Sequence, residues 1–328
     1  MRIAVFGSGS WATAIVKIAC ENHDEVFWWV REREVEHSVR QSGFNSLYLR
    51  NCKLERDKIK ISTDIGEILR ATDDAVLVIP SAFVEDAFAD LRKEDFEKKN
   101  IISAIKGIVP QKNQIIADFM QNKYDVSLDR QAVISGPSHA EEIAAQRLTY
   151  LTVASPNGDL ARRISCNFRC HYVSTKTSPD IKGIEYGGVM KNIYALAAGI
   201  CKGLGYGDNF IAVLIAKATL EISDFLNMVS PCKDREINNS VYLGDLLVTA
   251  YSQHSRNRTF GQMIGSGYSV ASAQLEMSMI AEGYYASRSI NSINQAVKAT
   301  IPIADAVYRI LHGGASAKEE MRALSEIF

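Results

Sequence analysis

Short apolar runs alternate with longer segments of helical spacing through the first half of the chain. Several runs are apolar at every position, as in residues 76–79, which is typical of strands covered by helices on both faces. This alternation predicts βαβ units built on a mostly parallel sheet. Strands are expected at residues 2–6, 25–30, 58–62, 75–79, 100–105, 132–135 and 150–154.

The pattern changes beyond about residue 178. Strand-like runs become scarce, and the alanine-rich stretches 194–199 and 211–225 have the spacing of helices. Pro179 fits a junction here, because proline disfavours helix in the residue before it. We therefore expect an α/β Rossmann domain with a doubly wound sheet over residues 1–178 and an all-α domain over residues 179–328.

Length and charge agree with this division. With 328 residues, the chain is longer than the roughly 250–300 residues at which a single hydrophobic core usually stops growing. Its 37 Lys and Arg residues balance 38 Asp and Glu residues, so no overall field attracts nucleic acid. A small anionic substrate would therefore need a local group of cations.

Three further patterns exclude other classes of protein. No run approaches the roughly 18 apolar residues of a membrane helix, and the first apolar run, residues 3–6, is a strand and not part of a signal peptide. We thus expect no stable membrane insertion. Six cysteines without a secretory signal favour reduced thiols and a cytoplasmic location. No metal site is expected, since Cys166, Cys170 and His171 lack a second ligand pair.

A glycine motif directly follows the first expected strand. Gly7, Gly9 and Ala12 form G-x-G-x-x-A, and a helix is expected from about Trp11 to Glu21. Gly7 permits a tight turn, Gly9 lets the backbone approach a pyrophosphate, and Ala12 lets helix pack on strand. An ordinary glycine turn could have the same letters, but the strand and helix on either side favour dinucleotide binding.

The end of the second expected strand bears on the choice of dinucleotide. NAD-specific folds place an acid there against the ribose hydroxyls, whereas an arginine can pair with a 2′-phosphate. Arg31 at this position favours NADPH, and Glu32 one residue later keeps NADH possible. Arg31 and Arg33 could also be solvated surface charges.

Two lysines are candidates for chemistry. Lys106 follows the strand expected at 100–105, and ligands bind at the carboxyl ends of strands in open α/β sheets. Lys191 lies on an expected helix, and Gly187 and Gly188 on the same face leave room for a ligand or for a close helix contact. Helix packing alone would also explain these glycines.

A polar cluster further along could bind a phosphate. Asp245 follows Gly244, and then Ser255, Arg256, Asn257 and Arg258 supply many hydrogen-bond donors. The same letters could simply mark a capped helix start on the surface.

These segments, in this order, resemble bacterial NAD(P)-dependent glycerol-3-phosphate dehydrogenases along nearly the whole chain. The resemblance implies a Rossmann domain, a helical domain and reversible reduction of dihydroxyacetone phosphate to sn-glycerol 3-phosphate for phospholipid synthesis. It also suggests a homodimer. The matching segments are GSGSWATA (7–14), Lys106-Gly107, SGPSHAEE (135–142), GGVMKN (187–192), GLGYGDN (203–209), Gly244-Asp245 and SRNR (255–258).

By position, the resemblance assigns Lys191 as the catalytic proton acceptor. It assigns substrate contacts to Lys106, Gly136, Ser138, Lys191, Asp245, Ser255, Arg256 and Asn257. It assigns cofactor contacts, beyond the glycine motif, to Ser10, Trp11, Arg31, Lys106, Ala140, Arg256, Ile280 and Glu282. One departure is that the family's G-L-G-D reads Tyr242-Leu243-Gly244-Asp245 here, which leaves the shape of this loop open.

The residues suggest a mechanism. A ketone that accepts hydride needs a proton on its oxygen, and Lys191 is the candidate donor. Burial or Lys106 would lower the pKa of this lysine and Asp245 would raise it, so the net direction stays open. His139 is a second, lower-ranked acid.

Two other functions compete with this one. A dehydrogenase of the β-hydroxy acid or sugar acid type would also use a helix lysine, but usually with an asparagine four residues later, where Ala195 stands. A non-enzymatic NADPH-binding redox sensor would not need the phosphate-binding cluster.

Overall fold

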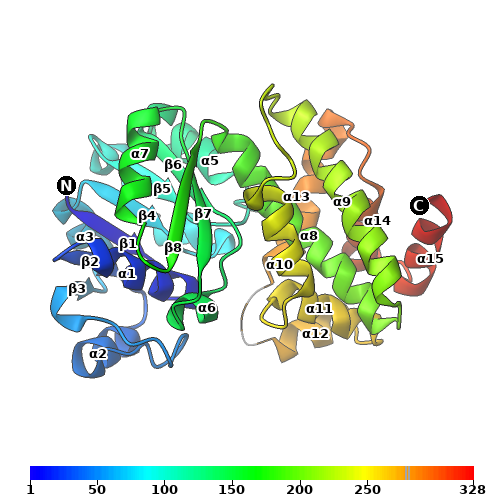
Figure 1. Cartoon of the computed structure of the whole chain (residues 1–328), viewed down its shortest axis with the longest axis horizontal. Coiled ribbons are helices and arrows are strands. Elements are labelled where there is room, and N and C mark those ends of the chain that lie inside the picture. Colours follow the sequence, from blue (N-terminus) through cyan, green and yellow to red (C-terminus); the bar gives the residue numbers. More distant parts are fainter. Residues whose placement is uncertain (278, 280) are drawn as a thin grey trace. The chain divides into compact units, whose positions relative to one another are not determined.

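The computed structural model describes residues 1–277, 279 and 281–328, and its contacts divide the chain into two units. The first unit comprises Met1–Ile105 and Ile116–Ile181, and the second comprises Lys106–Ile115 and Lys182–Phe328 (Figure 1). The division thus falls at 181 and not at 178, and the second unit also takes a short segment from the first half. That segment is held by polar contacts with α8 and α13 of the second unit: Asn192 Nδ2 donates to the Lys106 carbonyl at 2.8 Å and Asn113 Nδ2 to Ser292 Oγ at 3.2 Å.

One eight-stranded sheet forms the centre of the first unit, in the order β3-β2-β1-β4-β5-β6-β7-β8. The first six strands have the order of a dinucleotide-binding Rossmann fold. Only β6 and β7 pair antiparallel, so the sheet is mostly parallel, as predicted. The strands are β1 (Ile3–Phe6), β2 (Val26–Trp29), β3 (Ile59–Ser62), β4 (Asp74–Leu77), β5 (Asn100–Ser103), β6 (Gln131–Ser135), β7 (Thr149–Ala154) and β8 (Val173–Ser178).

The last strand, β8, is not among the expected strands. It pairs with β7 alone and forms an edge of the sheet, so half of its positions need not be apolar. Its sequence, VSTKTS, buries Val173 and Thr175 and leaves Lys176 exposed. A strand of this composition gives no apolar run, although its β-branched residues are typical of strands.

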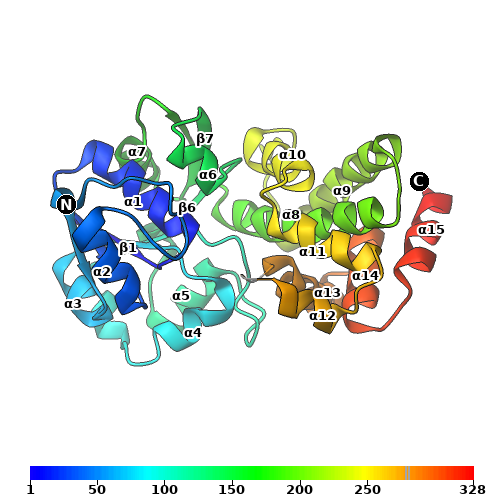
Figure 2. The same cartoon turned by 90° about the horizontal axis from the view of Figure 1, so that it is seen from below.

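Helices cover both faces of this sheet (Figure 2). Ile15 of α1, Ile143 of α6 and Ile164 of α7 share one hydrophobic cluster with strand residues such as Val5 and Ile134. The opposite face carries an aromatic group in which Phe88 contacts Phe6, Phe96 and Tyr124. The helices of this unit are α1 (Ser10–Asn22), α2 (Arg33–Ser42), α3 (Ile65–Ala71), α4 (Val84–Ala87), α5 (Ile116–Tyr124), α6 (Ala140–Ala144) and α7 (Gly158–Asn167).

The second unit is helical, and one helix, α8, lies at its centre (Figure 1). Residues 183–201 of α8 are buried on every side, as its apolar sequence requires. No helix of the described residues is long and apolar enough to span a bilayer. The helices are α8 (Ile181–Gly203), α9 (Asp208–Val229), α10 (Asp245–Tyr251), α11 (Arg256–Gly265), α12 (Val270–Glu276), α13 (Glu282–Val297), α14 (Pro302–His312) and α15 (Ala317–Ile327).

Helices α8 and α11 cross in direct backbone contact. Gly199 and Gly203 of α8 face Gly261 and Gly265 of α11, and each pair is spaced by one helical turn. A Cβ at any of the four would lie 2.1–2.3 Å from a carbonyl oxygen of the other helix. The crossing therefore fixes the start of α11 against α8.

We expect Gly261→Ala to destabilise the protein by about 1–3 kcal/mol, the usual cost of overpacking a tight contact. Its new methyl group would lie 2.2 Å from the Leu196 carbonyl oxygen, so the helices must separate. Urea unfolding measures this effect. Gly207→Ala is the control, because a Cβ there meets nothing within 4 Å, and an equal loss in both variants would contradict the prediction.

Candidate functional site

The turn between β1 and α1 is built on two glycines and leaves open space at the start of α1. Gly7 has φ +141°, and a Cβ there would lie 2.5 Å from the Val78 carbonyl oxygen, so a side chain does not fit. Gly9 is the N-cap of α1, and a Cβ there would meet nothing within 4 Å. Open space above Gly9 leaves the first amides of α1 accessible to an anion.

The side chains that follow hold this turn in place. Ser10 Oγ donates to the Tyr48 carbonyl at 2.9 Å, and Trp11 Nε1 donates to the Ala104 carbonyl at 2.9 Å. Ala12 is buried in the core, as its position in the motif requires. Ser10 and Trp11 can therefore offer a cofactor their backbone amides or an indole face, but their polar side-chain atoms already bond to protein carbonyls.

Arg31 lies just beyond the carboxyl end of β2, where the sequence places it. Its side chain is 65% exposed, and its Nη2 lies 2.8 Å from Oε1 of Glu32. The backbone N–H of Arg31 donates to Ser8 Oγ at 2.9 Å, which brings both residues against the glycine turn.

The segment after β6 forms a second tight turn in the first unit. Gly136 has φ +132°, and Ser138 Oγ donates to its carbonyl at 2.8 Å. Ala140 begins α6 and packs its side chain into the same core as Ala12. A contact of Ala140 with cofactor would thus involve its backbone.

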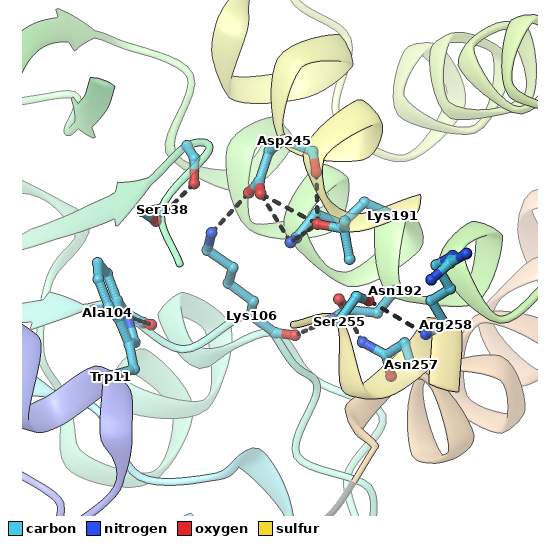
Figure 3. A network of polar contacts seen from close by, with 12 residues as sticks. Trp11, Ala104, Lys106, Ser138, Lys191, Asn192, Asp245, Ser255, Asn257 and Arg258 are labelled. Atoms are coloured by element: carbon cyan, nitrogen blue, oxygen red, sulfur yellow. Dashed lines mark hydrogen bonds and ion pairs between the residues drawn. The ribbon is translucent and has the colours of Figure 1, made fainter. Parts of the chain in front are cut away.

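In the second unit, two lysines meet one buried carboxylate (Figure 3). Lys106 Nζ lies 2.8 Å from Asp245 Oδ2, and Lys191 Nζ lies 2.8 Å from Asp245 Oδ1. Lys191 also donates to Thr249 Oγ1 at 2.6 Å. We call Lys106, Lys191, Asp245 and Thr249 the lysine–aspartate cluster.

Local sequence explains how this cluster forms. A π-helical turn, Ser240–Gly244, leads directly into α10, so Asp245 is the first residue of that helix. Thr249 stands four residues later and therefore on the same face. The Tyr242 ring packs directly against Gly187, since a Cβ at this glycine would lie 2.8 Å from the ring. The space that the sequence predicts beside Gly187 is therefore filled by the Tyr242 side chain.

Burial decides the charge properties of the cluster. Lys191 is 6% exposed, and desolvation lowers its pKa to about 8, helped by Lys106 and Arg256 and opposed by Asp245. Burial acts to raise the pKa of Asp245, but Lys106 and Lys191 outweigh it and lower that pKa. The direction left open by the sequence is therefore downward for the lysine, which makes it able both to give and to take a proton near neutral pH.

A chain of amides connects this cluster to α11 and α13. Asn192 Nδ2 donates to the Lys106 carbonyl, and Asn192 Oδ1 accepts from Asn257 Nδ2 at 2.9 Å. Asn257 Oδ1 in turn accepts from the Gly283 N–H at 2.9 Å. Asn257 is thus engaged within the protein and is linked through Asn192 to the backbone of Lys106.

The start of α11 carries the remaining predicted residues. Ser255 is the N-cap and accepts from the Arg258 N–H at 3.2 Å, so the capped helix start and the polar cluster are the same feature. Arg256 is exposed at the first turn, and its charge acts on Lys191. Glu282 begins α13. Ile280, an expected cofactor contact, lies outside the described residues.

Comparisons with known proteins agree over both units. A family model described as NAD-dependent glycerol-3-phosphate dehydrogenase N-terminus matches residues 2–161, and the corresponding C-terminus model matches residues 180–322. The chain is 33% identical over 324 residues to glycerol-3-phosphate dehydrogenase (NAD(P)+) of Exiguobacterium, covering 98% of this chain and 94% of that protein.

Two further similarities extend these matches. The enzyme of the same name from Geobacillus kaustophilus is 34% identical over 324 residues, with coverage of 98% and 94%. A crystal structure of glycerol-3-phosphate dehydrogenase from Coxiella burnetii is 27% identical, has a TM-score of 0.92 and covers 99% of this chain and 98% of its own.

Proposed function

Because the chain belongs to the NAD-dependent glycerol-3-phosphate dehydrogenase family, we propose that it reversibly reduces dihydroxyacetone phosphate to sn-glycerol 3-phosphate with NADH or NADPH. The observation that carries this proposal is the buried lysine–aspartate cluster, which keeps a low-pKa lysine close to the charge of Arg256. The family assignment does not favour the hydroxy-acid dehydrogenase or the redox sensor.

The glycine turn of the first unit suits the cofactor. Its open backbone at Gly9 would hold the pyrophosphate with the first amides of α1. A reduced nicotinamide, when bound, supplies the hydride for the ketone. The turn at Gly136 and Ser138 adds polar groups of the same unit, and we assign them to substrate, as the family resemblance implies.

Lys191 is the proposed proton donor for the ketone oxygen. Negative charge grows on that oxygen as reduction proceeds, and an ammonium group in a buried site stabilises it strongly. Asp245 holds the ammonium in place through Oδ1, and Thr249 fixes it from a second direction. In the reverse reaction the neutral amine takes the hydroxyl proton.

Arg256, with Ser255 and Asn257 beside it, is proposed to bind the phosphate. A guanidinium grips a phosphate through two parallel hydrogen bonds, and the N-terminus of α11 adds the positive end of the helix dipole. Holding the phosphate in this way places the carbonyl for reaction.

The loss of absorbance at 340 nm tests this function directly. Purified protein is mixed with NADH or NADPH and with dihydroxyacetone phosphate, and free dihydroxyacetone is the matched control. We expect cofactor oxidation with the phosphate ester and very little with the free ketone. Equal rates with both ketones, or no reaction with either, would contradict the proposal.

The pKa of Lys191 predicts opposite pH dependences for the two directions. Reduction needs the protonated amine, so kcat/KM for dihydroxyacetone phosphate should be level below pH 8 and fall above it. Oxidation needs the neutral amine, so kcat/KM for glycerol 3-phosphate should rise up to about pH 8 and then level off. Initial rates over pH 6–10 measure both; parallel profiles would contradict the role of this lysine.

A cytoplasmic location, supply of glycerol phosphate for phospholipid synthesis and a homodimeric state complete the proposal. All six cysteines are unbridged, which supports a reducing compartment. The dimer rests on the family resemblance, and sedimentation equilibrium of the purified protein tests it.

A further inference from the structure

The end of β2 holds a carboxylate beside the glycine turn of the first unit. Gly7 N donates to the Trp29 carbonyl at 3.0 Å, and the Arg31 N–H donates to Ser8 Oγ at 2.9 Å. Glu32 follows directly and is the N-cap of α2, so its backbone position is fixed by both neighbours. In Rossmann folds an acid at this strand end accepts a hydrogen bond from the adenosine 2′-hydroxyl.

The Glu32 carboxylate accepts hydrogen bonds from two neighbouring side chains at one of its oxygens. Its Oε1 accepts from Tyr48 OH at 3.1 Å and from Nη2 and Nε of Arg31 at 2.8 and 3.1 Å. The side chain is only 21% exposed. Its other oxygen, Oε2, is buried, and the Ser8 side chain also interacts with this carboxylate. The exposed part of the Glu32 side chain therefore remains the part that a ligand hydroxyl can reach.

Arg31, the residue that would favour a 2′-phosphate, is already engaged. Two of its donor groups point to Glu32, and its guanidinium lies 5.7 Å from the centre of the Phe83 ring. A 2′-phosphate would have to compete with the carboxylate for this guanidinium. It would also bring a second group of negative charge next to Glu32, in a partly buried site where repulsion is weakly screened.

We propose that Glu32 makes this protein select NADH over NADPH, by accepting a hydrogen bond from the adenosine 2′-hydroxyl and repelling a 2′-phosphate. The inference rests on the proposed function for its cofactor class. It reverses the preference that Arg31 favours in the sequence, because in the structure the charge of that arginine is paired with Glu32.

Binding of the two nucleotides in the absence of substrate tests this inference. Isothermal titration of the whole protein with NADH and with NADPH should give a dissociation constant at least about tenfold lower for NADH, the effect of one hydrogen bond to a charged group. In Glu32→Gln, which keeps the size and loses the charge, we expect this ratio to fall by about fivefold or more, mainly through tighter NADPH binding.

Glu36→Gln is the matched control, because Glu36 lies on α2 and pairs with Arg40 four residues later. It should leave the ratio unchanged. Equal or tighter binding of NADPH by the unaltered protein, or an unchanged ratio in Glu32→Gln, would overturn the inference while leaving the proposed function intact. Selective NADH binding without turnover of dihydroxyacetone phosphate would support the inference and defeat the proposed function; binding of neither nucleotide would defeat both.

Discussion

Replacement of Lys191 by methionine is expected to lower kcat for dihydroxyacetone phosphate reduction by on the order of 10²–10⁴-fold, the range for loss of a placed acid. Methionine fills the buried space but cannot give a proton. Asp245 keeps Lys106 as its ionic partner, so the carboxylate is not left alone in the core. Steady-state rates with saturating substrate measure the loss.

Cofactor binding separates this chemical effect from a folding effect. The glycine turn belongs to the first unit and Lys191 to the second, so the dissociation constant for NADH should change little in the variant. Lys202→Met is the control, because Lys202 lies on the same helix but is about half exposed and pairs loosely with Asp208. Retained turnover in Lys191→Met would show that another group supplies the proton.

Replacement of Arg256 by alanine should reduce kcat/KM for dihydroxyacetone phosphate by about 10²-fold, because two charge-assisted hydrogen bonds to phosphate are lost. The low rate with free dihydroxyacetone should fall far less, since that substrate has no phosphate to bind. Arg256 is exposed at the start of α11, so the fold should survive its removal.

Arg258→Ala provides the comparison for this arginine. Arg258 lies two residues later on α11 and thus points about 200° away around the helix. It should have far less effect on kcat/KM. If Arg256→Ala left kcat/KM for the phosphate ester unchanged, the phosphate would have to be bound elsewhere.

Much of the first unit could be predicted from sequence because its strands are buried. A strand covered on both faces is apolar at every position, as β1 is, and an apolar or alternating run predicted seven of the eight strands. The edge strand β8 was not predicted from the sequence. Its exposed positions can be serine, threonine or lysine without a loss of stability, so it contains no apolar run. The glycine turn was readable because only glycine tolerates the backbone of residue 7 and the contact it makes with Val78.

Only some residues of the candidate site in the second unit could be predicted from the sequence. Lys106, Lys191 and Asp245 were candidates from their sequence context, and the family resemblance implied their roles. Their convergence is a product of the tertiary structure. Thr249 was missed, although its spacing of four from Asp245 on a helix would have marked it. The link from Asn192 to Asn257 could not be foreseen, because the two residues lie 65 positions apart on helices whose crossing no local pattern reveals.

The preferred nucleotide, too, could not be predicted from the sequence pattern alone. Sequence places Arg31 and Glu32 side by side and cannot say which of them meets the ribose. In the structure, the Tyr48 hydroxyl donates to Glu32 from a loop sixteen residues later. This contact helps to fix the Glu32 carboxylate beside Arg31, and the order of residues in the sequence does not reveal it.

The glycine crossing of α8 and α11 has a consequence for the size of the substrate. Lys191 stands on one of these helices and Arg256 starts the other, and at the crossing no flexible side chain separates their backbones. The backbone that carries the proposed proton donor is thus held at a fixed separation from the backbone that carries the proposed phosphate ligand. Under these proposed roles, a phosphorylated ketone with one more carbon between carbonyl and phosphate should be a poorer substrate. The helix crossing would then make the protein selective for the number of bonds between these two groups.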